Sequence, residues 1–113
     1  MAFDQILAEE VRKALREYPV SEKRMFGGIG FMVNGKLCVS VNNRPDHIMM
    51  VRIDPKNQDE VLKRKGAKIA VMRGKKMPGW IFLQKETVET QKDFDFWIQQ
   101  AIDFNKTIAT LTS

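Results

Sequence analysis

Apolar residues recur at three- and four-residue spacing near the start of the chain, where Leu7, Val11, Leu15 and Tyr18 alternate with charged side chains. This pattern predicts an amphipathic helix, which ends before Pro19 because the residue preceding a proline disfavours helical backbone. A second stripe at the same spacing predicts a longer helix near the other end of the chain. Its members are Phe94, Trp97, Ile98, Ala101, Ile102, Asn105 and Ile108, of which only Asn105 is polar.

Extended apolar runs fill the region between these helices. Residues 24–33 and 36–41 are joined by Asn34-Gly35, the dipeptide that most favours a two-residue type I′ turn, so they predict a β-hairpin. Strict alternation would place Leu37, Val39 and Val41 toward the core and Lys36, Cys38 and Ser40 on the other side. Residues 47–53 alternate less cleanly, which predicts a strand covered on both faces.

The second half of the chain predicts one short helix and two further strands. Asp54-Pro55 is typical of a helix start, and Gly66 is placed to end that helix. Residues 67–72 and 80–84 are expected to be strands, with an irregular turn over residues 73–79 between them. Thr90, with Asp93 three residues later, fits a capping box for the last helix.

The order of elements is therefore α-β-β-β-α-β-β-α. Consecutive strands joined by short turns imply a mainly antiparallel sheet, and the amphipathic helices must bury their stripes against it. We predict an α+β fold in two layers, and the 113 residues are expected to form one domain over residues 1–113.

Composition excludes several classes of protein. With 43% hydrophobic and 29% charged residues, the chain is typical of a globular protein, and no apolar run approaches the roughly 20 residues of a membrane helix. The first residues mix acids and bases without a leader-like apolar stretch, so we expect a cytoplasmic protein without membrane contact. One cysteine and one histidine leave no internal disulfide, no cysteine-rich zinc site and no paired-histidine metal motif. No metal or cofactor is predicted.

Positive charge is concentrated in one segment. The chain carries a formal charge of +5, and residues 61–85 contain eight bases and no acid, whereas the remainder has eleven bases and fourteen acids. Solvated lysines at helix ends and in loops explain such a run in many proteins. The alternative is a surface for an acidic partner or nucleic acid, with Trp80 as its candidate aromatic residue. The candidate residues are Lys63, Arg64, Lys65, Lys68, Arg73, Lys75, Lys76 and Trp80.

Three glycines, Gly27, Gly28 and Gly30, fall inside the first extended run. A dinucleotide-binding loop is excluded because Val33 stands where the third glycine is needed and a hairpin follows instead of a helix. A phosphate loop is excluded because no Gly-Lys-Ser/Thr follows. The glycines are better explained by close approach of a neighbouring backbone or by a bulge that coils the sheet.

These residues carry a family resemblance. The pieces that carry it are the string RMFGGIGFMVNGKLC, followed by VRIDP, by Gly66-Ala67 and Met77-Pro78-Gly79-Trp80, and by WIQQA in the last helix. Together they resemble the N-terminal domain of TfoX/Sxy-type competence regulators. The resemblance covers about residues 3–104 and is most specific over residues 24–30. It implies an α+β domain with a curved antiparallel sheet and, in larger members, an association with transcription of DNA-uptake genes. We do not expect the second, helical domain of those regulators in this chain, and the resemblance supplies no catalytic or ligand residues.

Arg24 and Arg52 sit among apolar residues, where a guanidinium needs partners. In one interpretation both arginines pair with carboxylates or carbonyls. In the other they bind an anion beside the glycines. The residues of that alternative pocket are Arg24, Gly27, Gly28, Gly30 and Arg52. Cys38 and His47 could approach across paired strands, but spacing places no carboxylate to orient them, so no catalytic residue is assigned.

Two functions follow from these observations. The first is a non-enzymatic regulatory or adaptor domain that docks a protein partner through the basic segment 61–85, either alone or within a nucleic-acid complex. Direct binding of duplex DNA is a weaker form of this hypothesis. The second is a small-molecule or anion binder, or a cryptic enzyme, with its site near the glycine-rich hairpin. Self-association through an exposed sheet edge is a third expectation.

Overall fold

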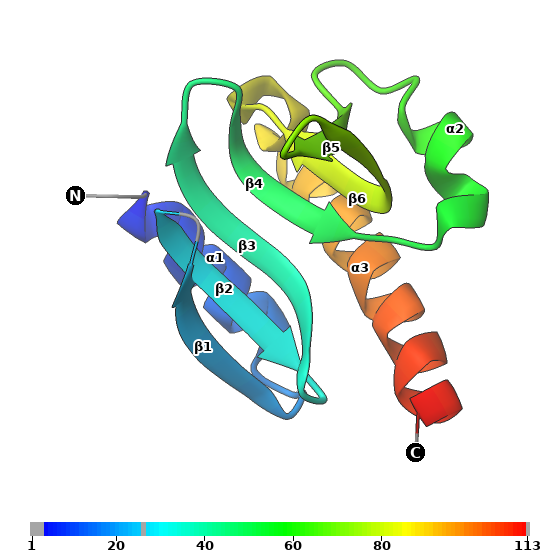
Figure 1. Ribbon diagram of the computed structural model, residues 1–113. Coiled ribbons are helices and arrows are strands. Elements are labelled where there is room, and N and C mark those ends of the chain that lie inside the picture. Colours follow the sequence, from blue (N-terminus) through cyan, green and yellow to red (C-terminus); the bar gives the residue numbers. More distant parts are fainter. Residues whose placement is uncertain (1–3, 26, 113) are drawn as a thin grey trace.

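A computed structural model describes residues 4–25 and 27–112 of the chain (Figure 1). The helices are α1 (Gln5–Leu15), the short α2 (Gln58–Val61) and α3 (Gln91–Thr112), with 3-10 turns η1 (Pro55–Asn57) and η2 (Lys85–Val88). The strands are β1 (Val20–Met25), β2 (Gly28–Val33), β3 (Lys36–Arg44), β4 (His47–Arg52), β5 (Lys68–Met72) and β6 (Lys75–Leu83). The order follows the prediction, with the first extended run divided between β1 and β2.

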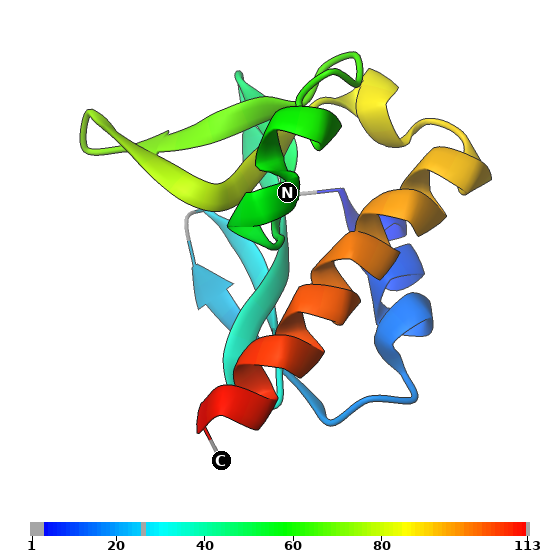
Figure 2. The same cartoon turned by 90° about the vertical axis from the view of Figure 1, so that its right-hand side faces the viewer.

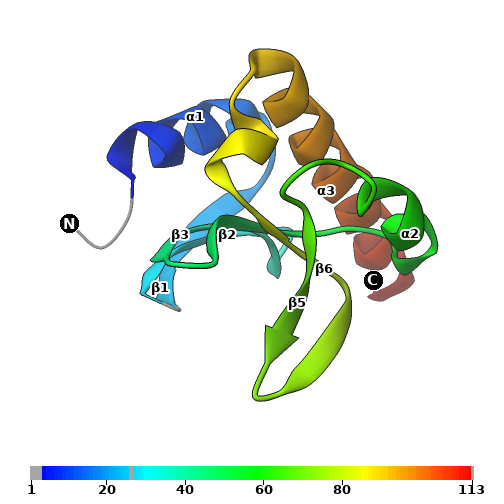
Figure 3. The ribbon, with the colours of Figure 1, turned by 90° about the horizontal axis from the view of Figure 1, so that it is seen from above.

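The six strands form one sheet in the order β1-β2-β3-β4-β6-β5, and every neighbouring pair is antiparallel. Helices α1 and α3 cover one face of this sheet, whereas the β5–β6 hairpin projects from the other side (Figures 2 and 3). The predicted α+β class and the antiparallel sheet with helices packed on it are confirmed. No helix in the described part of the chain is long and apolar enough to cross a membrane.

The main core lies between the two long helices and the sheet. Trp97 of α3 and Phe31 of β2 are its largest fully buried side chains, and Leu15 of α1 is also completely buried. Burying a large apolar side chain contributes about 1.5–3 kcal/mol, so the two amphipathic stripes account for the attachment of the helices. Asp4 begins α1 by accepting bonds from the backbone of Ile6 and Leu7.

The predicted N-cap of α3 and the predicted Asn34-Gly35 turn are confirmed. The hydroxyl of Thr90 accepts a hydrogen bond from the backbone N–H of Asp93 at 3.1 Å. Asn34 and Gly35 have φ values of 54° and 77°, as a type I′ turn requires. The polar member of the α3 stripe, Asn105, is buried and donates to the carbonyl of Val33 at 2.9 Å, so it ties α3 to this turn.

A bulge changes the side-chain pattern of β3. Phe31 pairs with Val39 and Met32 with Leu37, so Cys38 is an additional residue between the two pairs. Val39 and Val41 face the main core as predicted. The predicted sides of Leu37 and Cys38 are wrong, because the extra residue reverses the alternation: Cys38 joins the main core and Leu37 packs on the opposite face.

A second, smaller cluster holds the β5–β6 hairpin on the helix-free side. It consists of Met50, Ala70 and Phe82, with Leu37, Met72, Met77 and Trp80 packed around it. The predicted irregular turn over residues 73–79 is wrong: the turn is Arg73-Gly74 alone, and β6 already begins at Lys75. Residues 77–80 of β6 lie opposite Ala70 alone, and this large bulge accommodates Pro78 and Gly79 within a strand.

Candidate functional site

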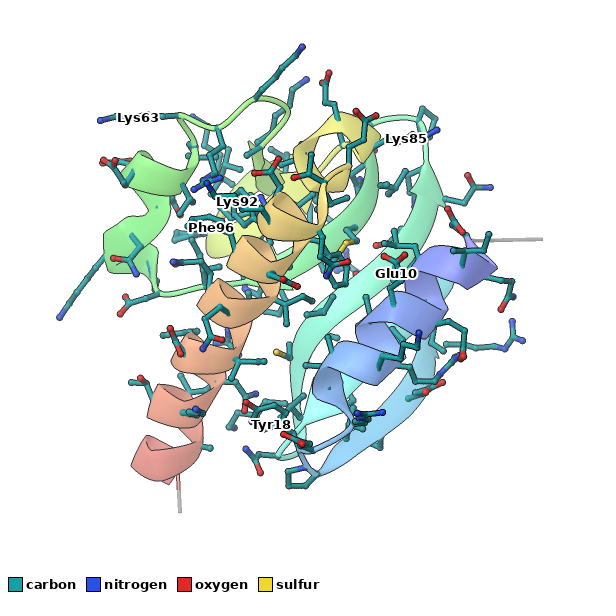
Figure 4. All side chains as sticks on the ribbon, turned by 180° about the vertical axis from the view of Figure 1, so that it is seen from behind. Glu10, Tyr18, Lys63, Lys85, Lys92 and Phe96 are labelled. Atoms are coloured by element: carbon teal, nitrogen blue, oxygen red, sulfur yellow. The ribbon has the colours of Figure 1, made fainter. Side chains whose placement is uncertain are left out.

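Seven of the eight bases in segment 61–85 form two groups in three dimensions, and the eighth, Lys85, lies in η2. Lys63, Arg64 and Lys65, in the connection between α2 and β5, each face a carboxylate, at 3.2 Å from Glu60, 3.4 Å from Asp93 and 3.7 Å from Glu86 respectively. The guanidinium carbon of Arg64 also lies 3.5 Å from the ring centroid of Phe96, on the side of α3 toward α2 (Figure 4). The charge of each of the first three candidates is thus partly balanced by a neighbouring carboxylate.

The other four cations lie on the projecting hairpin. We call them the hairpin cations: Lys68, Arg73, Lys75 and Lys76. All four are exposed, and within the described residues none of them takes part in an ion pair. Val71, with 47% of its surface exposed, lies among them. The hairpin therefore presents positive charge next to apolar surface, on the side away from α1 and α3 (Figure 3).

Trp80 lies at the base of this hairpin and is half-buried. The guanidinium carbon of Arg52 lies 5.0 Å from its ring centroid and 5.5 Å from that of Phe104 in α3. Cation–π contacts of this kind contribute about 0.5–1 kcal/mol when partly exposed. Arg52 thus joins β6 to α3 through two aromatic rings. These rings differ from the carboxylate or carbonyl partners considered for this residue from the sequence.

The alternative pocket does not assemble around its five residues. Arg24 is exposed on the edge strand β1, and the cavity beside it is lined by Gln5, Arg12, Glu22, Lys23, Arg24 and Ile29, without Arg52. Arg52 lies on β4, from which β1 is separated by β2 and β3. Gly27 occupies the connection between β1 and β2 with a φ of +73°.

Gly28 and Gly30 are explained by crowding. A Cβ atom on Gly28 would lie 2.0 Å from the carbonyl oxygen of Val41, and one on Gly30 would lie 2.6 Å from the sulfur of Met25. The absence of a side chain at Gly28 therefore lets β3 approach β2 at this point. The structural explanation by close approach is confirmed for Gly28 and Gly30, since close neighbours fill the space beside both residues, whereas Gly27 has open space around it.

A different cavity, of about 440 Å³, opens in the corner between the helix-free face of β3 and β4 and the projecting hairpin. We call it the corner cavity, and its lining residues are Asn42, Arg44, Asp46, His47, Met50, Val71, Met72, Arg73 and Phe82. Met50 and Phe82 of the second cluster supply an apolar floor. Two arginines and one carboxylate supply the charge, so the lining is net positive when His47 is neutral.

His47 forms a rigid wall of the corner cavity. Its ring is stacked on Phe82, and its Nδ1 lies 2.9 Å from Oδ1 of Asp46. Burial lowers the pKa of His47 below its usual value of 6.5, and the charge of Arg44 acts in the same direction, while Asp46 opposes both. The imidazole is therefore neutral at pH 7 and donates from Nδ1 to the carboxylate.

Cys38 and His47 do not form a catalytic pair. Cys38 is only 1% exposed and belongs to the main core, whereas His47 lies against the second cluster. Burial raises the pKa of the Cys38 thiol to about 12. Because the thiolate is the nucleophilic form, this thiol is unreactive at neutral pH. Within the described residues, no cluster of three or more His, Cys, Asp or Glu side chains could hold a metal ion.

The corner cavity was not predicted from the sequence. Its residues come from four strands and their turns, and no spacing along the chain indicates that they converge. One local signal was available: Arg73-Gly74 occupies a two-residue hairpin turn in which arginine is an unusual first residue.

Comparison with known proteins identified one family. The family model described as TfoX N-terminal domain matches residues 13–105, which is most of the chain. Searches of curated proteins and of solved structures gave no match.

Proposed function

Because the chain belongs to the TfoX N-terminal domain family, we propose that it is a non-enzymatic regulatory or adaptor domain that docks an acidic protein partner. The family is one of competence-regulator-like domains, which agrees with a role in regulation rather than catalysis. The basic segment 61–85 supplies the docking surface, and the hairpin cations are its central part.

One observation carries this proposal: four exposed cations without ion pairs in the described residues lie together on a hairpin that projects from the sheet. Such cations raise the local concentration of an acidic partner and speed its association. Val71 and the half-buried Met72 and Met77 add apolar contact surface beside the charge, and methionine and arginine are enriched in protein interfaces.

The test uses two variants with the same change in net charge. In the first, the four hairpin cations are replaced by Glu (Lys68→Glu, Arg73→Glu, Lys75→Glu and Lys76→Glu). In the control, four exposed lysines outside the hairpin are replaced: Lys13→Glu, Lys23→Glu, Lys56→Glu and Lys92→Glu. Partners are recovered from the source cell's lysate at low salt, with and without nuclease, and circular dichroism verifies that both variants fold.

The proposal expects that the hairpin variant loses the recovered protein and that the control keeps it. Recovery that survives nuclease indicates a protein partner. Equal recovery by the two variants would contradict the proposal, because the position of the cations on the hairpin would then not determine whether the partner binds.

Direct binding of duplex DNA is the second candidate function, favoured by the shape of the basic element. The β5–β6 hairpin is a two-stranded antiparallel ribbon, and the major groove admits a ribbon of that kind. If the hairpin neutralises phosphates, the logarithm of affinity falls with the logarithm of salt concentration, with a slope of about −0.9 per phosphate. A labelled duplex titrated at several salt concentrations measures this slope, and a flat response excludes the function.

Self-association is the third interaction to test. The sheet has two edge strands, β1 and β5, whose outer backbone groups could pair with a second copy. β1 carries three exposed charged residues, Glu22, Lys23 and Arg24, which oppose edge pairing, whereas β5 carries one, Lys68, so β5 is the edge we propose. Light scattering on the purified protein gives the mass, and a mass of one chain at high concentration would contradict this proposal.

A further inference from the structure

The corner cavity has the size and position of a small-molecule site. At about 440 Å³ it falls within the range of about 300–1,000 Å³ typical of ligand pockets. It lies where the projecting hairpin meets the helix-free face of β3 and β4, so two parts of the same sheet form its walls. None of its lining residues belongs to the main core beneath the helices, and the cavity is open to ligands from solvent.

Arg73 occupies a backbone position that suits other residues better. The turns at Asn34-Gly35 and Arg73-Gly74 have nearly identical backbones, with φ values of 54° and 77° in the first and 53° and 77° in the second. Asparagine and glycine tolerate this left-handed conformation, whereas a long side chain is disfavoured there. A residue in a backbone conformation that disfavours it, with no structural gain in exchange, points to a function. Arg73 is such a residue, and it lines the corner cavity.

The lining combines positive charge with an apolar floor. Arg44 and Arg73 contribute two guanidiniums, which bind carboxylates and phosphates through paired N–H donors. The one carboxylate, Asp46, is engaged with Nδ1 of His47 at 2.9 Å. Met50, Met72 and Phe82 add a floor that suits a hydrocarbon or aromatic group.

The polar wall is held in place by neighbouring side chains. The hydroxyl of Ser40 donates to the carboxamide oxygen of Asn42 at 2.8 Å, and both residues are buried. Stacking on Phe82 fixes the plane of the His47 ring. A site that is formed before the ligand arrives loses less entropy on binding.

We propose that the corner cavity binds a small organic anion, a carboxylate or phosphate on an apolar body, whose charged group meets Arg44 and Arg73 and whose body covers Phe82. This site takes a different ligand from partner docking by the hairpin, although Val71, Met72 and Arg73 belong to both surfaces. A simple inorganic anion would use only the guanidiniums and leave the floor uncovered, so the apolar body distinguishes the expected ligand.

The experiment titrates the purified protein with four probes and follows the imidazole signals of His47 by NMR. The chain contains a single histidine, so these signals are unambiguous. The probes are phenyl phosphate, benzoate, inorganic phosphate and phenol. We expect a saturable shift with phenyl phosphate or benzoate, with an affinity about tenfold or more above that of inorganic phosphate and of phenol. Which of the two binds identifies the phosphate or the carboxylate as the head group.

Three outcomes would overturn the proposal. The first is that neither phenyl phosphate nor benzoate moves the His47 signals in a saturable way. The second is that inorganic phosphate binds as tightly as phenyl phosphate, which would leave the floor without a role. The third is that phenol binds as tightly as the organic anions, which would leave the arginines without a role.

A pair of variants tests the part played by Arg73. Arg73→Asn removes one guanidinium and places a favoured residue in the turn, so the variant should fold at least as well as the parent chain. We expect about tenfold weaker binding of the organic anion by Arg73→Asn, because a hydrogen bond to a charged group is lost. The control, Arg24→Asn, removes the same charge from β1, outside the cavity, and should bind as the parent does.

Equal affinities of the two variants would also overturn the proposal. The measurement uses purified protein and small molecules only, so its failure leaves partner docking untouched. Conversely, the hairpin variant can lose the partner while Arg73→Asn alone retains it. That result would leave the proposal for the corner cavity untouched.

Discussion

The imidazole of His47 lies flat on the ring of Phe82, with ring centroids 3.7 Å apart and an angle of 1° between the planes. His47 begins β4 and Phe82 lies near the end of β6, so the stack joins two neighbouring strands at one edge of the corner cavity. Because the stack buries the imidazole, the same contact that forms the cavity wall also disfavours the charged form of the histidine.

The first prediction concerns the pH dependence of stability. Since burial lowers the pKa of His47 in the folded state below 6.5, the unfolded chain binds the proton first as the pH falls. The contribution of His47 to the free energy of unfolding is therefore constant above pH 6.5 and decreases as the pH falls from 6.5 toward the folded pKa. NMR titration of the single histidine should give a midpoint below 6.5, and a midpoint at or above that value would contradict this explanation.

The variant His47→Gln serves as the control for this pH dependence. Urea denaturation at several pH values compares it with the parent chain. The variant should lack the decrease that the parent shows just below pH 6.5, since glutamine does not titrate.

The second prediction concerns the turn of the β5–β6 hairpin. Arg73→Asn should raise the free energy of unfolding by about 0.5–1 kcal/mol, because asparagine adopts positive φ with less strain than arginine. Urea denaturation measures the change. Arg73→Lys retains both the charge and the strain and should leave stability unchanged, so an equal gain in that variant would refute the role of the turn.

The third prediction concerns the buried amide of α3. Asn105 donates to the carbonyl of Val33 and accepts from the side-chain amide of Asn34 at 3.1 Å. Asn105→Leu should cost about 1–3 kcal/mol, because it leaves the carbonyl of Val33 buried without its partner. Faster hydrogen exchange at the β2–β3 turn should accompany the loss. Gln99→Leu, at an exposed position of the same helix, should change stability little.

The fourth prediction separates the two crowded glycines. Gly28→Ala places a methyl group against the backbone carbonyl of Val41, so a strand must move, and we expect a cost of about 1–3 kcal/mol or more. Gly30→Ala meets the flexible end of Met25, which can rotate away, and should cost less. Thermal unfolding of both variants gives the order, and the reverse order would contradict the close approach of β3 to β2.

Local chemistry was sufficient to predict much of the fold. Asn34-Gly35 determines its turn because few other dipeptides tolerate two positive φ values, and Thr90 caps α3 through a hydrogen bond to a residue three positions away. The stripe from Phe94 to Ile108, with Asn105 as its polar member, identified one helix that covers the sheet. Each of these features depends on residues a few positions apart, so the spacing in the sequence already contains the geometry.

Features that depend on strand register could not be predicted in this way. The bulge at Cys38 reverses the sides of Leu37 and Cys38, and the alternation of residue types gave no indication of the inserted residue. The bulge opposite Ala70 converted an expected irregular turn into part of β6. A shift of one residue in pairing moves every following side chain to the other face, so small local irregularities have large effects.

The sequence by itself determined the α+β class, the helices with their caps and the concentration of positive charge in residues 61–85. Only the tertiary structure decided which of those charges are available, because Arg64 pairs with Asp93, twenty-nine positions away, whereas Arg73 reaches the corner cavity. The physical reason is distance along the chain: propensity and periodicity act between near neighbours, while ion pairs, stacked rings and cavities are formed by residues that folding alone brings together.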